Sequence, residues 1–377
     1  MIAVIADDLT GAAELAGIGL RYGLEVELWT ALPSASRADL VVVSTDSRSV
    51  SKDEAVKITG RVLECIKNLQ PEWIYKKIDS VFRGHVLEEL KLQMQLTGPD
   101  KAIVLAANPS LGRTIRDGVY YVNGVAVSET GFAADPEFAI SNSSVRQMLQ
   151  AGEKELEICR HTGIIPDKGI IVAEAATNEE VAAWADKAGN HSVLAGAGDF
   201  FAALLDKTLA SRPQPQPDLE RPFLYVCGTA FAGSHAFIKE VQRKHGCVAY
   251  LPVPVLQGQA DEVLVRTVHE LLRQQGRAIV AIDPDETRLS DFPAPSLRKA
   301  MANTVKMIIQ AAPVRELFVE GGSTASAVLA ALDIQAVRPV NELQRGVVRM
   351  KDSNDTIYIT VKPGSYALPK LISALYY

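Results

Sequence analysis

Short apolar runs rich in valine and isoleucine alternate with longer stretches of helical periodicity along this chain of 377 residues. That alternation indicates repeated βαβ units, which build mainly parallel sheets covered by helices. In the first half it predicts strands near 2–6, 24–30, 40–45, 73–78, 102–106, 169–173 and 192–196. In the second half it predicts strands near 222–227, 247–252, 277–282, 315–320 and 356–361, and helices near 234–245, 260–275, 296–311 and 324–332.

The alternation is interrupted once, where Pro213, Pro215 and Pro217 stand at every second position. Such a run can neither continue a helix nor pair in a central strand, because proline lacks the amide donor. We therefore predict two α/β domains, 1–205 and 222–377, joined by a proline-rich linker over 206–221. A hydrophobic content of 47% is enough to fill two separate cores.

Composition argues against several classes of partner. The formal net charge is −6 and no run is rich in lysine or arginine, whereas binding to nucleic acid or to an anionic membrane relies on concentrated positive charge. The start, MIAVIADDLTG, has neither the basic region nor the long apolar core of a signal peptide, so we expect a cytoplasmic protein. Its four cysteines show no CxxC spacing, which favours reduced, buried thiols over a zinc site.

Asp7 and Asp8 directly follow the first predicted strand and precede a helix. In open α/β sheets ligands bind beyond the carboxyl ends of the strands, so polar residues there are candidates for a binding site. Successive side chains of a strand point to opposite faces, which predicts different roles for the two aspartates. The alternative is that one of them only caps the helix.

Three further strand-end segments in the first half carry similar chemistry. Cations, carboxylates and hydroxyls at such an edge can hold a polyhydroxy carboxylate, and the planar fork of an arginine suits a carboxylate. For the segment at 75–85, a solvated, charged turn is the alternative. The candidate substrate-binding residues in these segments are Arg48, Lys77, Asp79, Ser80, Arg83, Asn108 and Arg113.

In the second half, glycines follow the predicted strands at the points where helices begin. Glycine lets the backbone approach a phosphate, and a helix N-terminus supplies free amides and a positive dipole end. A plain tight turn capped by Ser323 is the alternative. Lys362, between a predicted strand and Gly364, places a cation beside one of these loops. The candidate nucleotide-binding residues are Thr229, Gly321, Gly322, Ser323, Thr324 and Gly364.

Other phosphate-transfer and hydrolase frameworks are excluded by spacing and order. The sequence has no GxxxxGK[ST] loop and no HRD with DFG, and Gly17, Gly19 and Gly23 lack the spacing of a dinucleotide turn. An α/β-hydrolase places its histidine after the serine, yet the last histidine, His269, precedes Ser323. No histidine pair has metal-ligand spacing, and among the histidines only His85 falls in a candidate site.

With both groups of loops in view, the sequence resembles the four-carbon acid sugar kinases, which phosphorylate threonate, erythronate and 3-oxo-tetronates with ATP. The chain departs from the family's usual residues at Val81, His85 and Ser323. The resemblance covers almost the whole chain. It is carried by ADDLTGA at 6–12, TDSR at 45–48, KKIDSVFRGH at 76–85, GRT at 112–114, SETGFAADP at 128–136, GGSTA at 321–325 and VKPGSYA at 361–367.

The resemblance implies a sugar-acid domain at 1–205 and a nucleotide-binding domain at 222–377, with the active site in the cleft between them. It puts Asp8, Arg48, Lys77, Asp79, Ser80 and Arg83 around the sugar acid. It puts Thr229, Gly321 to Thr324 and Gly364 around ATP.

We accordingly predict an ATP-dependent kinase that acts on the terminal hydroxyl of a four-carbon sugar acid. Asp8 is assigned as the base, Arg48 or Arg83 to the substrate carboxylate, and Lys77 to phosphate or carboxylate charge. Mg²⁺ is expected with ATP and with few protein ligands. A non-catalytic sensor of nucleotide and metabolite, or a kinase of a different small hydroxy acid, remains an alternative; a homo-oligomer is compatible with the sequence.

Overall fold

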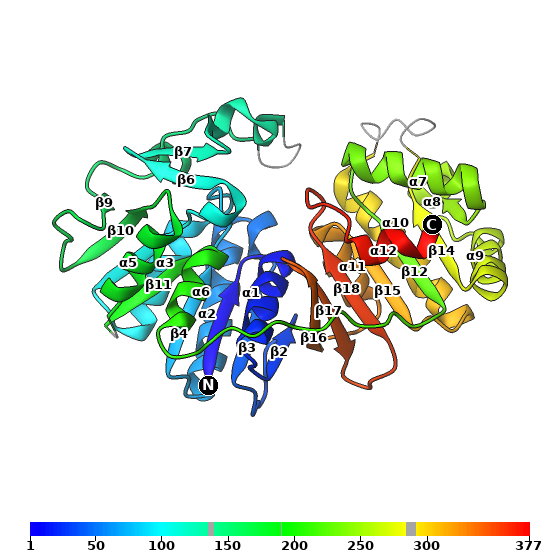
Figure 1. Cartoon of the computed structure of the whole chain (residues 1–377), viewed down its shortest axis with the longest axis horizontal. Helices are drawn as coiled ribbons and strands as arrows, with labels where there is room; N and C mark the ends of the chain where they lie inside the picture. Colours follow the sequence, from blue (N-terminus) through cyan, green and yellow to red (C-terminus); the bar gives the residue numbers. More distant parts are fainter. Residues whose placement is uncertain (135–138, 190, 284–291) are drawn as a thin grey trace. The chain divides into compact units, whose positions relative to one another are not determined.

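The computed structural model describes residues 1–134, 139–189, 191–283 and 292–377, and the chain divides into two compact units, Met1–Pro213 and Gln214–Tyr377. In each unit, helices flank a mainly parallel sheet (Figure 1). The predicted fold class of two α/β domains is therefore confirmed. No described helix is both long and apolar enough to cross a membrane.

The main sheet of unit 1 consists only of parallel pairs, in the order β2-β3-β1-β4-β11-β5-β10-β9. Its strands are β1 (Ile2–Ala6), β2 (Val26–Trp29), β3 (Leu40–Ser44), β4 (Trp73–Lys77), β5 (Lys101–Leu105), β9 (Leu156–Arg160), β10 (Gly169–Glu174) and β11 (Ser192–Gly196). Its α-helices are α1 (Leu9–Arg21), α2 (Lys52–Asn68), α3 (Val86–Thr97), α4 (Val145–Met148), α5 (Asn178–Lys187) and α6 (Gly198–Asp206). Of these strands, only the edge strand β9 was not predicted.

The register of the central strands brings their carboxyl ends together. Ala6 at the end of β1 lies opposite Ser44 of β3 on one side and Lys77 of β4 on the other. The loops that follow these three strands therefore leave the sheet at the same edge. This alignment is what places the candidate residues of unit 1 near one another.

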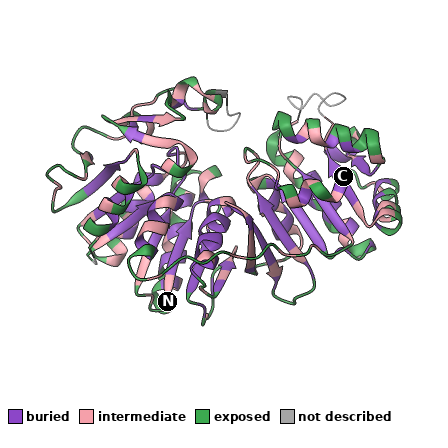
Figure 2. Ribbon diagram, in the orientation of Figure 1, coloured by how far each residue is buried: buried purple, intermediate pink, exposed green. Residues whose placement is uncertain are grey.

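Alternating strand residues and a helical stripe form one layer of the core of unit 1. Ala3 and Ile5 of β1 pack with Val62, Leu63 and Ile66 of α2. Every second residue of a strand and every third or fourth residue of a helix lie on one face, so these side chains face each other. Figure 2 shows the resulting buried strands beneath helices whose outer faces are exposed.

A small antiparallel sheet was missed by the prediction. It consists of β6 (Arg113–Arg116), β7 (Val119–Val122) and β8 (Val125–Ala126), followed by the short helices η3 (Val127–Glu129) and η4 (Gly131–Ala134). Its turns are Asp117-Gly118 and Asn123-Gly124, in which all four residues have positive φ. Asp-Gly and Asn-Gly are the strongest short-range hairpin signals, so the sequence did contain this information.

Unit 2 combines parallel pairing with an antiparallel hairpin, in the order β13-β14-β12-β15-β18-β17-β16. Its strands are β12 (Phe223–Cys227), β13 (Val248–Tyr250), β14 (Arg277–Ala281), β15 (Glu316–Glu320), β16 (Ala336–Gln344), β17 (Val347–Asp352) and β18 (Tyr358–Lys362). Its α-helices are α7 (Ala232–His245), α8 (Val253–Leu256), α9 (Glu262–Gln275), α10 (Ala294–Ala311), α11 (Gly322–Ala331) and α12 (Lys370–Ser373). The hairpin β16–β17 was not predicted, since Pro339 within β16 and two shifts of register, between Pro339 and Asn341 and between Glu342 and Gln344, obscure its alternation.

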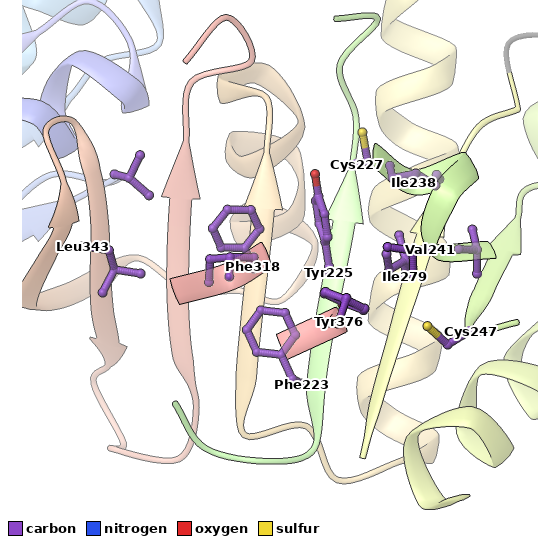
Figure 3. Packing of buried hydrophobic residues seen from close by; sticks show 14 residues of the cluster. Phe223, Tyr225, Cys227, Ile238, Val241, Cys247, Ile279, Phe318, Leu343 and Tyr376 are labelled. Carbon is purple, nitrogen blue, oxygen red and sulfur yellow. The ribbon is translucent and has the colours of Figure 1, made fainter. Parts of the chain in front are cut away.

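Aromatic residues fill one face of the unit 2 sheet (Figure 3). Phe223 and Tyr225 of β12 pack beside Phe318 of β15, and Tyr225 meets Phe318 edge to face at 5.0 Å between ring centroids. Ile238 of α7 and Tyr376 near the C-terminus cover this face. The strand ends above this core are thereby fixed, and the glycine-containing loops start from them.

Residues 207–222, between α6 and β12, form neither helix nor strand. The division between the two compact units falls after Pro213, within this segment.

Candidate functional site

The strand ends of unit 1 gather charged side chains around one arginine. Arg48 lies in the 3₁₀ turn after β3, Asp7 and Asp8 follow β1, and Asp79 follows β4. Arg48 donates from Nε and Nη2 to both carboxylate oxygens of Asp7, at 3.1 and 3.0 Å. Its guanidinium also lies 3.0 Å from Asp8 Oδ1 and 3.4 Å from Asp79 Oδ1.

This arrangement occupies the fork of Arg48 with a carboxylate of the protein itself. From the sequence, the fork of Arg48 or Arg83 is expected to bind the carboxylate of a substrate; in the structure, the fork of Arg48 binds Asp7 in a bidentate manner. Burial would lower the pKa of Arg48, and the three neighbouring carboxylates outweigh it and raise that pKa. Arg48 therefore links the loops after β1, β3 and β4.

The two adjacent aspartates have different environments. Burial raises the pKa of Asp7 more than Arg48 lowers it, and Asp8 and Asp79 raise it further. Burial also acts on Asp8, but Arg48, Lys77 and hydrogen bonds from Thr10 and Gly11 lower its pKa overall. Asp8 is thus held as a carboxylate, and its side chain is 15% exposed against 6% for Asp7.

Asp8 is also the N-cap of α1. Its Oδ1 accepts a hydrogen bond of 2.8 Å from the amide of Gly11, which satisfies one of the free amides of the first helical turn. The capping role and a role toward a ligand are compatible, because a carboxylate oxygen can accept more than one hydrogen bond.

Asp79 organises the loop after β4. It accepts hydrogen bonds from the amides of Val81 and Arg83, and Arg83 binds it through Nε and Nη2 at 2.9 and 2.8 Å. These hydrogen bonds and the charges of Arg83 and Arg48 overcome burial and lower the pKa of Asp79 far below its usual value. Asp79 is therefore buried and fully engaged within the protein.

Lys77, the last residue of β4, is buried beside Glu14 of α1, a residue that the sequence analysis did not single out. Lys77 Nζ lies 3.5 Å from Glu14 Oε2 and donates to the carbonyl of Ile78 at 3.0 Å. Glu14 is the sixth residue after Asp8 and is buried in α1, and a carboxylate among the small and apolar residues of that helix is the signal that could have identified it. The ammonium group is also close enough to Asp8 to lower the pKa of that carboxyl.

Asn108 and Arg113 meet at the end of β5. Their backbones exchange hydrogen bonds of 2.8 and 3.1 Å, and the side chain of Asn108 accepts from the amide of Asp199 at the start of α6. Arg113 donates from Nη1 to the hydroxyl of Ser80. Among the described residues, no carboxylate forms an ion pair with Arg113, which distinguishes it from Arg48 and Arg83.

A hollow of about 720 Å³ adjoins this group within unit 1, and Arg48 and Arg83 lie on its wall. Val81 and His85 line the same hollow. His85 is fixed by a contact of 2.7 Å between Nε2 and the carbonyl of Val50. The predicted segment 128–136 is described only as far as Ala134, so Asp135 and Pro136 lie outside the described residues.

In unit 2, three loops surround a cavity of about 300 Å³. The loops follow β12, β15 and β18, which are neighbours in the sheet. All the residues that the sequence analysis suggested for a nucleotide line this one cavity: Thr229, Gly321, Gly322, Ser323, Thr324 and Gly364.

The first turn of α11 opens on this cavity. Its N-cap, Gly321, has φ 105°, a conformation that residues with a side chain rarely adopt. No side chain caps the helix, so the amides of its first turn are not satisfied in that way. Ser323 therefore does not act as a cap, contrary to the alternative considered above, and the turn has the features of an anion-binding helix start.

A buried ion pair fixes the loops beneath the cavity. Lys362 and Glu320 end the adjacent strands β18 and β15, are fully buried, and lie 2.8 Å apart. Glu320 also accepts hydrogen bonds from Tyr225 of β12 and Ser234 of α7. Lys362 donates to the carbonyls of Pro363 and Gly364, so it supports the glycine loop from below.

The cavity has an apolar side that the sequence analysis missed. Ile282, Leu297 and Met301 line it, the last two from α10. Leu297 and Met301 are four residues apart on one face of a helix, a spacing that in the sequence could not be told from ordinary core packing. His235 also lines the cavity, so His85 is not the sole histidine in a candidate site.

Across the described ranges, no group of three or more histidine, cysteine, aspartate or glutamate side chains is arranged to hold a metal ion. Glu320 is committed to Lys362, Ser234 and Tyr225, as described above.

Two families of known domains match the chain, one in each of its two units. Residues 2–204 match a family of sugar-binding N-terminal domains, and residues 224–366 match a family of nucleotide-binding C-terminal domains.

Curated relatives align over most of the chain. A D-threonate kinase of Salmonella typhimurium is 28% identical, with 99% of this chain and 97% of the relative covered. A D-threonate kinase of Bordetella bronchiseptica is 27% identical over 92% of this chain and 88% of the relative. A D-erythronate kinase of Heliobacterium modesticaldum is 27% identical over 65% of this chain and 61% of the relative.

Solved structures share the fold at lower identity. A Haemophilus influenzae protein has a TM-score of 0.77 at 19% identity, with 99% of this chain and 98% of that protein covered. A Salmonella typhimurium protein has a TM-score of 0.78 at 17% identity, with the same coverage. The two matched domains, which span most of the sequence, and the curated kinases show that the chain belongs to the four-carbon acid sugar kinase family and is a small-molecule phosphotransferase.

Proposed function

We propose that this chain uses ATP to phosphorylate the terminal hydroxyl of a four-carbon sugar acid of the threonate, erythronate or 3-oxo-tetronate type. The proposal rests on one observation, the different chemistry of the loops at the strand ends of the two units. One unit has an uncapped helix start and glycine loops around a single cavity, and the other gathers carboxylates and arginines. Relatives named as kinases of threonate and erythronate support the substrate class.

The unit 2 cavity suits both the phosphates and the base of a nucleotide. The first amides of α11 and the loops at Thr229 and Gly364 offer donors and close approach for phosphate oxygens. Ile282, Leu297 and Met301 offer an apolar surface of the kind on which a nucleobase packs. On this proposal the phosphates lie at the helix start and the base lies against α10.

Mg²⁺ fits this cavity as a companion of ATP that is bound mainly by phosphate oxygens and water, because Glu320, the carboxylate at the end of β15 beneath the cavity, is already paired. Bound there, it would neutralise phosphate charge. Among the described residues, the protein offers backbone donors for the phosphate oxygens. The nucleotide itself offers the oxygens that bind the cation.

For the carboxylate of the sugar acid we assign Arg113 in place of Arg48. The fork of Arg48 is used by Asp7, and that of Arg83 is used by Asp79. Arg113 has a hydroxyl partner, Ser80, and so retains both its charge and further donors. A guanidinium without a paired carboxylate is the better receptor for an anion.

For the chemical step we assign Asp8 as the acceptor of the hydroxyl proton. The hydroxyl oxygen forms a bond to the γ-phosphorus, the bond from that phosphorus to the leaving oxygen of ADP breaks, and the proton passes to the Asp8 carboxylate. Phosphoryl transfer depends on positioning and charge neutralisation more than on covalent help from the protein. Lys77, held beside Asp8, is suited to neutralise charge on the incoming phosphoryl group.

The proposal is tested by incubating the protein with ATP and Mg²⁺ and, separately, with D-threonate, L-threonate, D-erythronate, L-erythronate or a 3-oxo-tetronate. We expect ADP release and a product heavier by one phosphoryl group with one or two of these acids. Binding of both ligands without turnover would instead indicate a sensor. Turnover with none of them, but with another hydroxy acid, would refute the four-carbon substrate class.

Gly322 is predicted to lie against the phosphates of ATP. A valine side chain there would occupy the space of a close phosphate, and losing a few hydrogen bonds to a charged group should raise the KM for ATP by about 10- to 100-fold. Ala330→Val, at an exposed position of the same helix, is the matched control. Unchanged ATP affinity by calorimetry in a folded Gly322→Val variant would refute this location.

Asp8→Asn is predicted to lower kcat by about two to four orders of magnitude with little change in KM, the range for losing a general base. Asparagine is as good an N-cap as aspartate, so α1 stays capped, although one of the three carboxylates around Arg48 loses its charge. Asp7→Asn is the comparison, since it weakens the Arg48 ion pair. If that variant is folded and inactive while Asp8→Asn is nearly normal, Asp7 is the base.

Arg113→Lys is predicted to raise the KM for the sugar acid by about 10- to 100-fold without lowering the melting temperature, because lysine keeps the charge but loses the planar fork. Arg48→Lys should mainly lower the melting temperature, since Arg48 bridges three buried carboxylates. The opposite pattern, a raised KM from Arg48→Lys and none from Arg113→Lys, would restore the carboxylate-binding role to Arg48.

A further inference from the structure

Phe132 contacts two arginines of the sugar-acid site at once. Its ring centroid lies 5.7 Å from the guanidinium carbon of Arg83 and 5.6 Å from that of Arg113. The arginines come from different parts of unit 1, one from the loop after β4 and the other from the start of β6. Phe132 itself lies in η4, which follows the small antiparallel sheet.

The backbone of Phe132 is held from both sides. Its carbonyl accepts a hydrogen bond of 3.1 Å from the amide of Ile140, and its amide donates to the hydroxyl of Thr130 at 3.4 Å. Two residues before Thr130, the amide and hydroxyl of Ser128 are hydrogen-bonded to the hydroxyl of Ser143. Val127, next to Ser128, is fully buried. The ring is therefore attached to a fixed part of the fold.

A phenyl ring holds a guanidinium in a way that a carboxylate cannot. It attracts the cation through its quadrupole, yet it accepts no strong hydrogen bond and adds no negative charge. Arg48, held by carboxylates, has its fork occupied and its charge balanced. Arg113, held by Phe132 and the Ser80 hydroxyl, keeps its charge available to a ligand.

We infer that Phe132 is a positioning residue for the sugar-acid carboxylate. Its ring keeps the guanidinium groups of Arg83 and Arg113 near each other against their mutual repulsion and fixes the orientation of the Arg113 fork. The inference rests on the proposed function, in which Arg113 binds the substrate carboxylate.

The test compares Phe132→Leu, which keeps an apolar side chain but removes the ring, with Phe132→Tyr, which keeps the ring. Two cation–π contacts of ordinary strength correspond to about 5- to 30-fold in affinity. We expect Phe132→Leu to raise the KM for the accepted acid by this factor, with the KM for ATP unchanged and only a modest fall in the melting temperature. Phe132→Tyr should stay within about twofold of the wild type.

A double-mutant cycle separates positioning from simple packing. If Phe132 acts through Arg113, Phe132→Leu should have little further effect on the KM for the acid in an Arg113→Lys background. Additive effects of the two substitutions, or an unchanged KM in Phe132→Leu, would overturn the inference while the wild-type enzyme still turns over its acid. A wild-type protein that neither binds nor phosphorylates any acid of the panel would overturn the proposed function and this inference with it.

Discussion

Paired charge at the carboxyl ends of parallel strands is the constraint on which both candidate sites depend. Burying an unpaired charge costs several kcal/mol or more, so a charged side chain at a buried strand end must find a partner on a neighbouring loop. In unit 1, Arg48 forms ion pairs with Asp7, Asp8 and Asp79, and these pairs connect the loops that follow three strands. In unit 2, the pair of Glu320 and Lys362 does the same for the loops that follow β15 and β18.

The two units meet this constraint at equivalent points of their sheets. The order β2-β3-β1-β4 in unit 1 has the same form as β13-β14-β12-β15 in unit 2. In each, the chain moves outward from its first strand, returns beside it, and then crosses to its other side. Loops diverge at such a switch point and leave space for a ligand, so chain topology alone brings Asp7 and Asp79 together, and likewise Thr229 and Gly321.

The sequence predicted those parts of the fold and of the sites that follow from local periodicity and strand ends. Nearly all the parallel strands were predicted, and the residues suggested for the nucleotide line one cavity, because strand ends in parallel sheets share an edge. The small antiparallel sheet was missed although its Asp-Gly and Asn-Gly turns were visible. The pairing of Arg48 with Asp7 could not be foreseen, since the sequence does not say which of several cations at an edge meets which carboxylate.

The partner that holds each charged group decides what that group can offer to a ligand. Arg48 and Arg83 are balanced by carboxylates, whereas Arg113 is held by a ring and a hydroxyl and keeps its positive charge. Of the adjacent aspartates, Asp7 has a raised pKa and lies deeper, while Asp8 has a lowered pKa and is the more exposed. On the proposed function, unit 1 therefore presents a cation to one end of its ligand and a carboxylate to the other. That polarity suits a hydroxy acid bound with its carboxylate at Arg113 and its terminal hydroxyl at Asp8, and it disfavours the reverse orientation, in which two carboxylates would face each other.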